Sequence, residues 1–417
     1  MARPGGLSRI VKTGYAVAVT EKLFYQDPSL LEFDASILTY GPRGALHEVV
    51  LDRTCFFPGS GGQPADRGTL NGARVVELED RDGEIVHVVD AALAAGPVHG
   101  SVDAARRRDY MAQHTGEHIL AQALLRAGRL PTVSVHFGEE TTTIELEAAV
   151  APEEVLKKAE ELANAVIREN RPVRIHDVDP AEASRFTLRR KPPEVGRLRI
   201  VDIDGWDAVG CSGVHVPSTG AVFMIKIVGQ EKMRGHARIH AIIGERCIAD
   251  YGRRIAMTQA LSRVLTCGEE SILARVEELV RNARERDREM KKIRVEQAVA
   301  SARAAAETGR KTARALIIRG ISDGAGPDYL QAFADEAISA PGRVAVAMDR
   351  TAAGFQWIVA HSLGAGLDLP SLLKPLLAQA GAKGGGKPAW MQGMGTSAEA
   401  AGAFADLVEE AIGRATV

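Results

Sequence analysis

Two pairs of metal-binding residue types stand far apart in this chain, and they constrain its fold more than any other feature. His114 and His118 are separated by four positions where apolar residues follow helical spacing, so both imidazoles project from one face of the expected helix. Cys211 and His215 have the same separation in a glycine-rich turn that we expect to lead into a strand from Ala221. Imidazole nitrogen and thiolate sulfur together suit zinc. The sequence therefore predicts that helix and turn converge on one Zn²⁺ ion.

The number of protein ligands stays open at this point. Four ligands close a tetrahedral site, whereas a catalytic zinc keeps a position for water or substrate, so His215 or another member can stand outside the coordination sphere. Gly116 lies between the two histidines, where glycine costs ~1 kcal/mol relative to alanine in a helix. This indicates that another part of the protein approaches the helix closely.

A second interpretation of the first pair is a zinc protease. His114, Glu117 and His118 fit the H-x-x-E-H pattern, in which Glu117 would be the general base. Such a protease takes its third ligand from a carboxylate on a following helix, and the Cys211 and His215 pair differs from that. The motif is short and easily met by chance.

Composition excludes several other classes. With 52 basic and 54 acidic residues the net charge is −2, so no overall positive field indicates a nucleic-acid partner, although a local patch remains open. Four cysteines in 417 residues are too few for a disulfide scaffold. No window approaches the ~18 apolar residues of a membrane helix, and Met1 to Thr20 lacks an apolar block with a cleavage site. We expect a cytoplasmic protein.

Hydrophobic patterning predicts an α+β protein with four parts. Short apolar runs with frequent turns, such as the one at Asp82-Gly83, indicate a β-rich, barrel-like domain over 1–105. The α+β zinc domain follows over 106–247, and we expect its first helix to run from His114 to Ala127 and to stop at Gly128. Three-four spacing among many charges predicts a helical spacer over 248–312, which either packs on its own protein or forms an intermolecular coiled coil. Alternating strand-like and helical runs predict a small α/β domain over 313–417.

Two basic segments are candidates for binding a polyanion, with a solvated surface as the alternative for each. The segment 185–199 has a single acid, Glu194, and six basic residues: Arg185, Arg189, Arg190, Lys191, Arg197 and Arg199. Near the end, Gly386-Lys387 almost completes a phosphate-binding loop, but Pro388 stands in place of the required Ser or Thr and the preceding segment looks helical. Lys383 and Lys387 flank three glycines that offer backbone N–H groups to an RNA phosphate.

A glycine-rich segment precedes the first histidine pair. Gly61 and Gly62 permit close backbone approach, and the amide of Gln63 both donates and accepts hydrogen bonds. On these three residues alone, an ordinary turn between strands explains the segment.

Taken in order, four motifs resemble the alanyl-tRNA editing proteins called AlaX, stand-alone relatives of the editing region of alanyl-tRNA synthetase. They are residues 61–68 (GGQPADRG), 114–120 (HTGEHIL), 135–138 (VHFG) and 211–216 (CSGVHV), and the resemblance covers roughly Tyr15 to Gly244. The tail resembles the carboxy-terminal domain of that synthetase. By position, the resemblance places the family's zinc ligands on His114, His118, Cys211 and His215. Val214 and Arg67 depart from the family pattern.

The resemblance implies a zinc-dependent hydrolase that removes serine, or also glycine, from mischarged tRNA(Ala). A hydrophobic pocket discriminates poorly against an amino acid that carries one added hydroxyl group. Aminoacyl-tRNA synthetases for small amino acids therefore need a second site that hydrolyses the wrong product. Thr132 and Ser134 are our candidates for contacting the serine hydroxyl, and Gln63 and Glu117 complete the candidate catalytic residues. The basic residues above would hold tRNA, and the spacer and tail are candidates for homodimer contacts. The rivals are a metalloprotease and a non-catalytic tRNA-binding protein with structural zinc.

Overall fold

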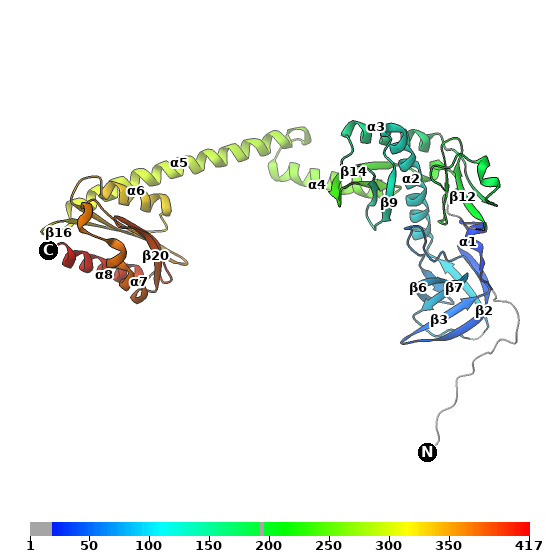
Figure 1. The fold of residues 1–417 in the computed structure, drawn as a ribbon, viewed down its shortest axis with the longest axis horizontal. Helices are drawn as coiled ribbons and strands as arrows, with labels where there is room; N and C mark the ends of the chain where they lie inside the picture. Colours follow the sequence, from blue (N-terminus) through cyan, green and yellow to red (C-terminus); the bar gives the residue numbers. More distant parts are fainter. Residues whose placement is uncertain (1–18, 95, 192–195) are drawn as a thin grey trace, which may run out of the picture. The chain divides into compact units, whose positions relative to one another are not determined.

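The computed structural model describes residues 19–94, 96–191 and 196–417, and it divides at Thr258 and Gln259 into two compact units (Figure 1). Several sheets and both long and short helices confirm the α+β class. The predictions made for the chain before Val19 and for Glu194 lie outside the described residues. The predicted domain boundaries stay predictions.

Six antiparallel strands of the first unit close a barrel. Their order around it is β2 (Glu32–Arg43), β3 (Leu46–Leu51), β7 (Glu84–Val89), β6 (Ala73–Arg81), β5 (Gly68–Leu70) and β8 (Pro97–Val102). Apolar residues of several strands, among them Leu51, Leu70 and Ile85, are fully buried in its core. The predicted turn at Asp82-Gly83 is confirmed, since both residues have positive φ and connect β6 to β7.

Three short elements border the barrel. They are β1 (Glu21–Lys22), α1 (Leu23–Gln26) and β4 (Arg53–Thr54), and β1 pairs in parallel with β4. The edge-to-face contact between Phe24 of α1 and Phe57, with ring centroids 5.6 Å apart, anchors α1 beside the loop that follows β4.

The central helix of the unit is α2 (Ala104–Gly128). It begins well before the predicted start at His114, because the Asp103 side chain caps it by accepting from the Arg106 N–H. Residues 110–121 are buried without a break, so the helix has no solvent face there and its polar residues lie inside the protein. Its predicted end at Gly128 is confirmed, and Arg129 follows in the left-handed region.

Two sheets and one more helix surround α2. One sheet has the order β14 (Ile225–Met233), β15 (His236–Ile243), β10 (Thr142–Leu146) and β9 (Thr132–Phe137); the other is β11 (Val173–Val178), β12 (Leu198–Ile203) and β13 (Asp207–Gly210). Helix α3 (Glu153–Arg168) packs its apolar stripe on the same core. Short 3-10 turns occur at η1 (Glu182–Arg185) and η2 (Thr219–Val222). The predicted strand start at Ala221 is wrong, because η2 occupies that position and β14 begins only at Ile225.

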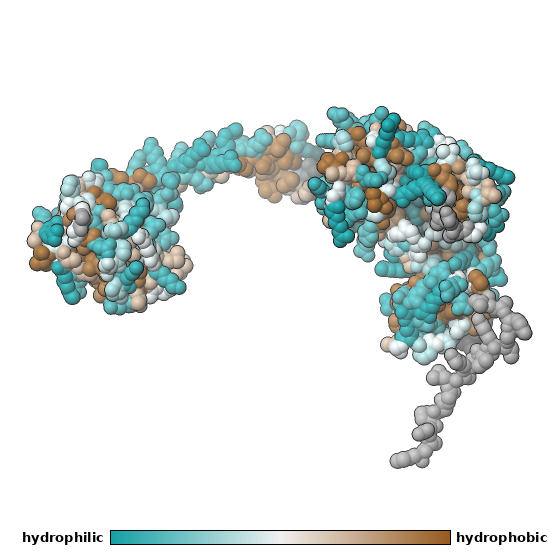
Figure 2. Space-filling view, viewed as in Figure 1, coloured by the Kyte–Doolittle hydropathy of each residue, from teal (hydrophilic) through white to brown (hydrophobic). Residues whose placement is uncertain are grey.

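Two helices carry the chain through the predicted spacer. Helix α4 (Arg246–Leu265) crosses the division between the units, and α5 (Ile272–Glu307) follows after η3 (Glu269–Ser271). In the second unit, exposed apolar side chains gather where α4 ends and α5 begins, among them Leu261, Val264 and Leu273 (Figure 2). Among the described residues, no helix is both long and apolar enough to cross a membrane.

The second unit is built on a six-stranded sheet with helices on both faces. Its order is β16 (Arg310–Lys311), β17 (Leu316–Asp323), β18 (Arg343–Thr351), β19 (Gly354–His361), β21 (Trp390–Gly395) and β20 (Ala382–Lys387). Helices α5 and α6 (Pro327–Ala337) cover one face, and α7 (Leu369–Gln379) and α8 (Ala400–Ala415) cover the other, with η4 (Gly364–Gly366) before α7. The run from Lys383 to Lys387 is therefore part of the exposed edge strand β20 and not of a loop.

Candidate metal centre

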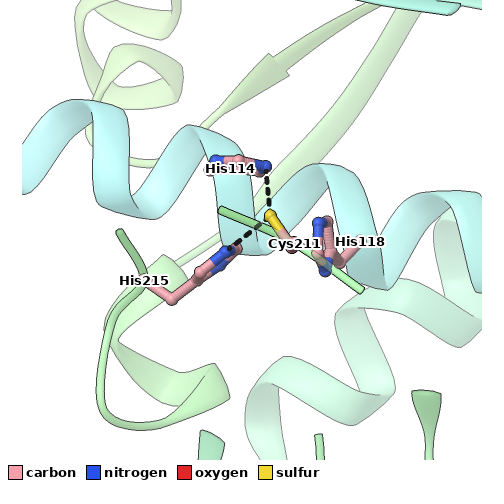
Figure 3. Close-up of side chains that lie close together, drawn as sticks. All are labelled: His114, His118, Cys211 and His215. Atoms are coloured by element: carbon pink, nitrogen blue, oxygen red, sulfur yellow. Dashed lines mark hydrogen bonds between the residues drawn. The ribbon is translucent and has the colours of Figure 1, made fainter. Parts of the chain in front are cut away.

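The two predicted pairs come together in the first unit. One donor atom each from His114, His118, Cys211 and His215 lies within 4.8 Å of the other three. The Cys211 Sγ is 3.3 Å from Nε2 of His114 and 3.4 Å from Nε2 of His215 (Figure 3). Helix α2 presents two of the side chains, and the loop after β13 presents the other two. The predicted convergence of helix and turn is present in the structure.

Two glycines let the surrounding chain approach closely. A Cβ at Gly116 would lie 2.5 Å from Cγ2 of Ile243 on β15, so the close approach predicted from the helix glycine is confirmed. A Cβ at Gly213 would lie 2.1 Å from Cε1 of His114. A side chain at Gly213 would therefore displace a candidate ligand.

A loop of the barrel fixes the protonation of His114. The Gln63 Oε1 accepts from the Val214 N–H at 3.1 Å, which identifies that atom as oxygen because a backbone N–H only donates. The same Oε1 lies 2.8 Å from Nδ1 of His114. Since the oxygen accepts, Nδ1 carries the proton and Nε2 holds a free lone pair on the side facing Cys211. Outer partners of this kind orient metal-ligating histidines.

The other two imidazoles have different surroundings. Nδ1 of His215 lies 3.1 Å from the Thr115 hydroxyl, which also accepts from the Val216 N–H. Among the described residues, the buried Nδ1 of His118 has no hydrogen-bond partner. A buried nitrogen without a partner is costly in the absence of a ligand, and this fits a site made to hold an ion.

The electrostatics of the four donors also fit a metal ion. Burial lowers the pKa of His114 to about 3, and it holds the pKa values of His118 and His215 well below their usual range. These imidazoles are therefore neutral at pH 7 and offer lone pairs. Burial raises the pKa of the Cys211 thiol to about 11, so its deprotonation at neutral pH needs a cation beside the sulfur. Zn²⁺ supplies such a charge and accepts these donors.

A cavity of about 380 Å³ opens beside the cluster. His114, His118 and Cys211 line it, whereas His215 is not among the lining residues. Glu117 and Ser134, two predicted catalytic residues, also line the cavity. The buried Gln63 and Thr132 do not, so Gln63 contacts a candidate ligand and not the cavity.

The predicted basic segment separates into inner and outer residues. Arg189 and Arg190 line the cavity, and each has a partner: Arg189 forms a buried ion pair with Asp207 at 3.1 Å, and Arg190 donates to Thr132. Arg199 donates to the backbone carbonyls of Cys211 and Gly213 in the loop after β13.

The remaining basic candidates are exposed. Arg185 and Arg197 pair with acidic neighbours, and Lys191 is exposed. Lys383 and Lys387 are exposed on β20 of the second unit.

Several residues that support the candidate site were not identified from the sequence. Thr115 stands inside the H-x-x-x-H motif, and only its place on a fully buried helix face would have singled it out. Asp66 of the glycine-rich segment pairs with the buried Arg107 of α2 and accepts from the Phe57 N–H at 2.7 Å. This part of the motif therefore fastens the barrel loop to α2.

Comparisons with known proteins connect the chain to alanine-specific tRNA enzymes. Residues 198–240 match the family described as the threonyl and alanyl tRNA synthetase second additional domain. The alanine--tRNA ligase of Pyrococcus abyssi is 31% identical over 393 residues, which cover 90% of this chain and 42% of the ligase. The mouse alanyl-tRNA editing protein Aarsd1 is 31% identical over 273 residues, which cover 64% of this chain and 66% of that protein.

A solved structure matches part of the chain. The C-Ala domain of Aquifex aeolicus alanyl-tRNA synthetase covers 25% of this chain and 97% of its own, at 15% identity and a TM-score of 0.24. This chain spans less than half of the length of the Pyrococcus abyssi ligase.

Proposed function

Because this chain belongs to the family of alanyl-tRNA editing proteins related to alanyl-tRNA synthetase, we propose that it hydrolyses mischarged tRNA(Ala) at the His114, His118, Cys211 and His215 centre. The reaction adds water to the aminoacyl ester and releases the free amino acid and the ribose hydroxyl of the tRNA. Serine is the proposed amino acid, with glycine as the second candidate. The proposed resident ion is Zn²⁺.

The single observation that carries the proposal is the position of the donors at an open cavity. A purely structural zinc is closed off by its protein ligands, whereas His114, His118 and Cys211 all line a cavity of about 380 Å³. A cavity of this size accommodates an amino acid attached to a ribose. Bound Zn²⁺ would supply Lewis acidity next to the ester.

Other side chains around the centre orient the ligands, transfer the proton and bind the phosphates. Gln63 and Thr115 hold the imidazoles of His114 and His215 in place. The carboxyl of Glu117 lines the cavity and is the candidate to carry a proton between the attacking water and the departing ribose oxygen. Arg190, whose partner Thr132 is uncharged, gives the wall a positive charge that suits the phosphates of a tRNA terminus, while Asp207 balances the charge of the neighbouring Arg189.

Selection for serine requires a polar contact at the cavity wall. Ser134 lines the cavity and donates its hydroxyl proton to Glu145 at 2.7 Å, which leaves its oxygen free to accept from a serine hydroxyl. Alanine lacks that hydroxyl and would leave the polar site unpaired. Thr132 lies behind Arg190 and would act on the pocket indirectly.

The test is deacylation of Ser-tRNA(Ala) by the purified full chain with measured metal content. We expect about one zinc per chain, hydrolysis that stops with a chelator, and loss of both metal and hydrolysis in Cys211→Ala. The matched control is Cys247→Ala, since Cys247 is also buried but its thiol faces the Ile242 carbonyl. Full activity in a protein without metal would remove the role of the ion.

Two rival functions predict no deacylation and are identified by a proteolysis assay and a tRNA-binding assay. A metalloprotease would cleave casein and lose that cleavage in Glu117→Gln, without acting on aminoacyl-tRNA. A tRNA-binding protein with structural zinc would bind tRNA(Ala) but release no serine from it.

A further inference from the structure

Three successive carbonyl groups of the metal-binding loop are held by side chains from distant segments. Nη1 of Arg199 on β12 donates to the Cys211 carbonyl at 2.9 Å and to the Gly213 carbonyl at 2.7 Å. The Tyr25 hydroxyl on α1 donates to the carbonyl between them, that of Ser212, at 2.9 Å. Arg199 and Tyr25 therefore fix the backbone of the segment that carries the Cys211 sulfur.

The two holding side chains also contact each other. The Arg199 guanidinium lies 4.6 Å from the centroid of the Tyr25 ring, within the distance of a cation–π contact. Both side chains are partly buried, and Nε and Nη2 of Arg199 are hidden from solvent. The ring limits where the guanidinium can lie, so the two residues act as one stacked pair.

The loop needs such a restraint. Residues 211–213 belong to neither strand nor helix, so no continuous ladder of hydrogen bonds holds them. The Gly213 N–H donates to the Cys211 Sγ at 3.3 Å, and the Cys211 N–H donates to the Arg199 carbonyl at 3.0 Å. The Ser212 hydroxyl lies 2.6 Å from the Ser60 hydroxyl. A small rotation of this loop would turn the sulfur away from the Nε2 atoms of His114 and His215.

We propose that the stacked pair of Tyr25 and Arg199 positions the Cys211 sulfur for metal binding. These are positioning residues and not ligands, because both act on carbonyl groups of the loop. The inference rests on the proposed metal centre, and it assigns to α1, which precedes the barrel, a part in building that centre.

The test measures metal affinity without tRNA. Tyr25→Phe, Arg199→Lys and the double variant of the full chain are titrated with Zn²⁺ against a chelator, and bound Co²⁺ is followed by its absorption spectrum. The matched controls are Tyr40→Phe, whose hydroxyl contacts His47 at 2.8 Å, and Arg174→Lys, whose guanidinium pairs with Asp204 at the surface. Unfolding of each metal-free variant by urea reports the stability of the fold.

We expect Arg199→Lys to weaken Zn²⁺ binding roughly 10- to 100-fold, the usual effect of losing an outer partner of a metal ligand, and Tyr25→Phe to weaken it less. The double variant should lose less than the product of the single losses, because both side chains hold one loop. The Co²⁺ spectrum should shift in the three variants and stay unchanged in both controls.

Unchanged affinity and spectrum in Tyr25→Phe and Arg199→Lys would overturn the inference. A loss of stability in the metal-free variants that accounts for the whole change in affinity would overturn it too, because the pair would then support only the fold. A wild-type chain that binds no metal would overturn both proposals. One that binds metal with the expected variant effects but hydrolyses no aminoacyl-tRNA would overturn the proposed function alone.

Discussion

The side-chain oxygen of Gln63 lies 2.8 Å from Nδ1 of His114, which joins a loop of the barrel to a candidate metal ligand on α2. Gln63→Ala removes the acceptor that keeps the proton on Nδ1, so we expect Zn²⁺ affinity to fall roughly 10- to 100-fold. Isothermal titration of the metal-free protein with Zn²⁺ measures this. Gln26→Ala is the control, since its amide donates to Glu21 at an exposed position. Equal affinity in Gln63→Ala and wild type would contradict the assignment.

Gly116→Ala tests the contact between α2 and β15. Alanine favours a helix by ~1 kcal/mol, but its Cβ would lie 2.5 Å from Cγ2 of Ile243, so we expect a net loss of about 1–3 kcal/mol in the free energy of unfolding. The control is Gly252→Ala in α4, where a Cβ meets nothing within 4 Å and a gain is expected. Urea denaturation compares the two. Stabilisation by both substitutions would show that the contact does not limit the residue at 116.

Asp66→Ala tests the ion pair inside the glycine-rich motif. The change leaves the Arg107 guanidinium buried without its counter-charge and the Phe57 N–H without its acceptor. We expect the free energy of unfolding to fall by about 3–5 kcal/mol. Asp204→Ala, which removes the exposed partner of Arg174, should cost at most about 1 kcal/mol. Similar losses in both variants would argue against a special role for the buried pair.

His87 makes the stability of the barrel depend on pH. It is fully buried between Thr54 and the Val49 carbonyl, and burial lowers its pKa from 6.5 to about 4. As the pH falls, the unfolded chain takes up a proton first, so the stabilisation present above pH 6.5 is lost toward pH 4. For this one group the loss amounts to about 3 kcal/mol between pH 7 and 4.

The measurement is urea unfolding at a series of pH values for wild type and His87→Gln. The variant should lose less stability on acidification, because it has no group to titrate at this position. His99→Gln is the control with the opposite sign, since hydrogen bonds to Asp34 and Glu32 raise the pKa of the exposed His99, and this variant should lose more stability on acidification than wild type. An identical pH slope in wild type and His87→Gln would contradict the prediction.

The sequence predicted the donors of the candidate site better than the parts that orient them. The separation of His114 from His118, and of Cys211 from His215, is visible in the chain because each pair is local. The start of α2 was missed because Arg107 reads as a surface residue, although it is buried by its pairing with Asp66. Nothing in the sequence indicated a role for Tyr25, because its hydrogen bond to the Ser212 carbonyl depends on tertiary packing alone.

Secondary structure, too, was predicted correctly where it depends on local sequence and missed where it depends on tertiary contacts. The hairpin at Asp82-Gly83 and the end of α2 at Gly128 depend on local backbone preferences, and both were predicted correctly. The start of β14 depends on the 3-10 turn η2, where the Thr219 hydroxyl donates to the Val166 carbonyl of α3. No sequence pattern within residues 219–225 indicates that hydrogen bond. The edge strand β20 exists through its pairing with β21, which the run of glycines hides.

Through the Gln63 loop, the barrel also orients a side chain of the candidate metal centre. Grafting α2 and the Cys211 loop onto a foreign scaffold would transfer every donor atom but leave the His114 imidazole free to exchange tautomers. The barrel loop thus supports the candidate metal centre, and we expect recombination that separates the barrel from α2 to yield a protein with the same four donors and a lower affinity for Zn²⁺.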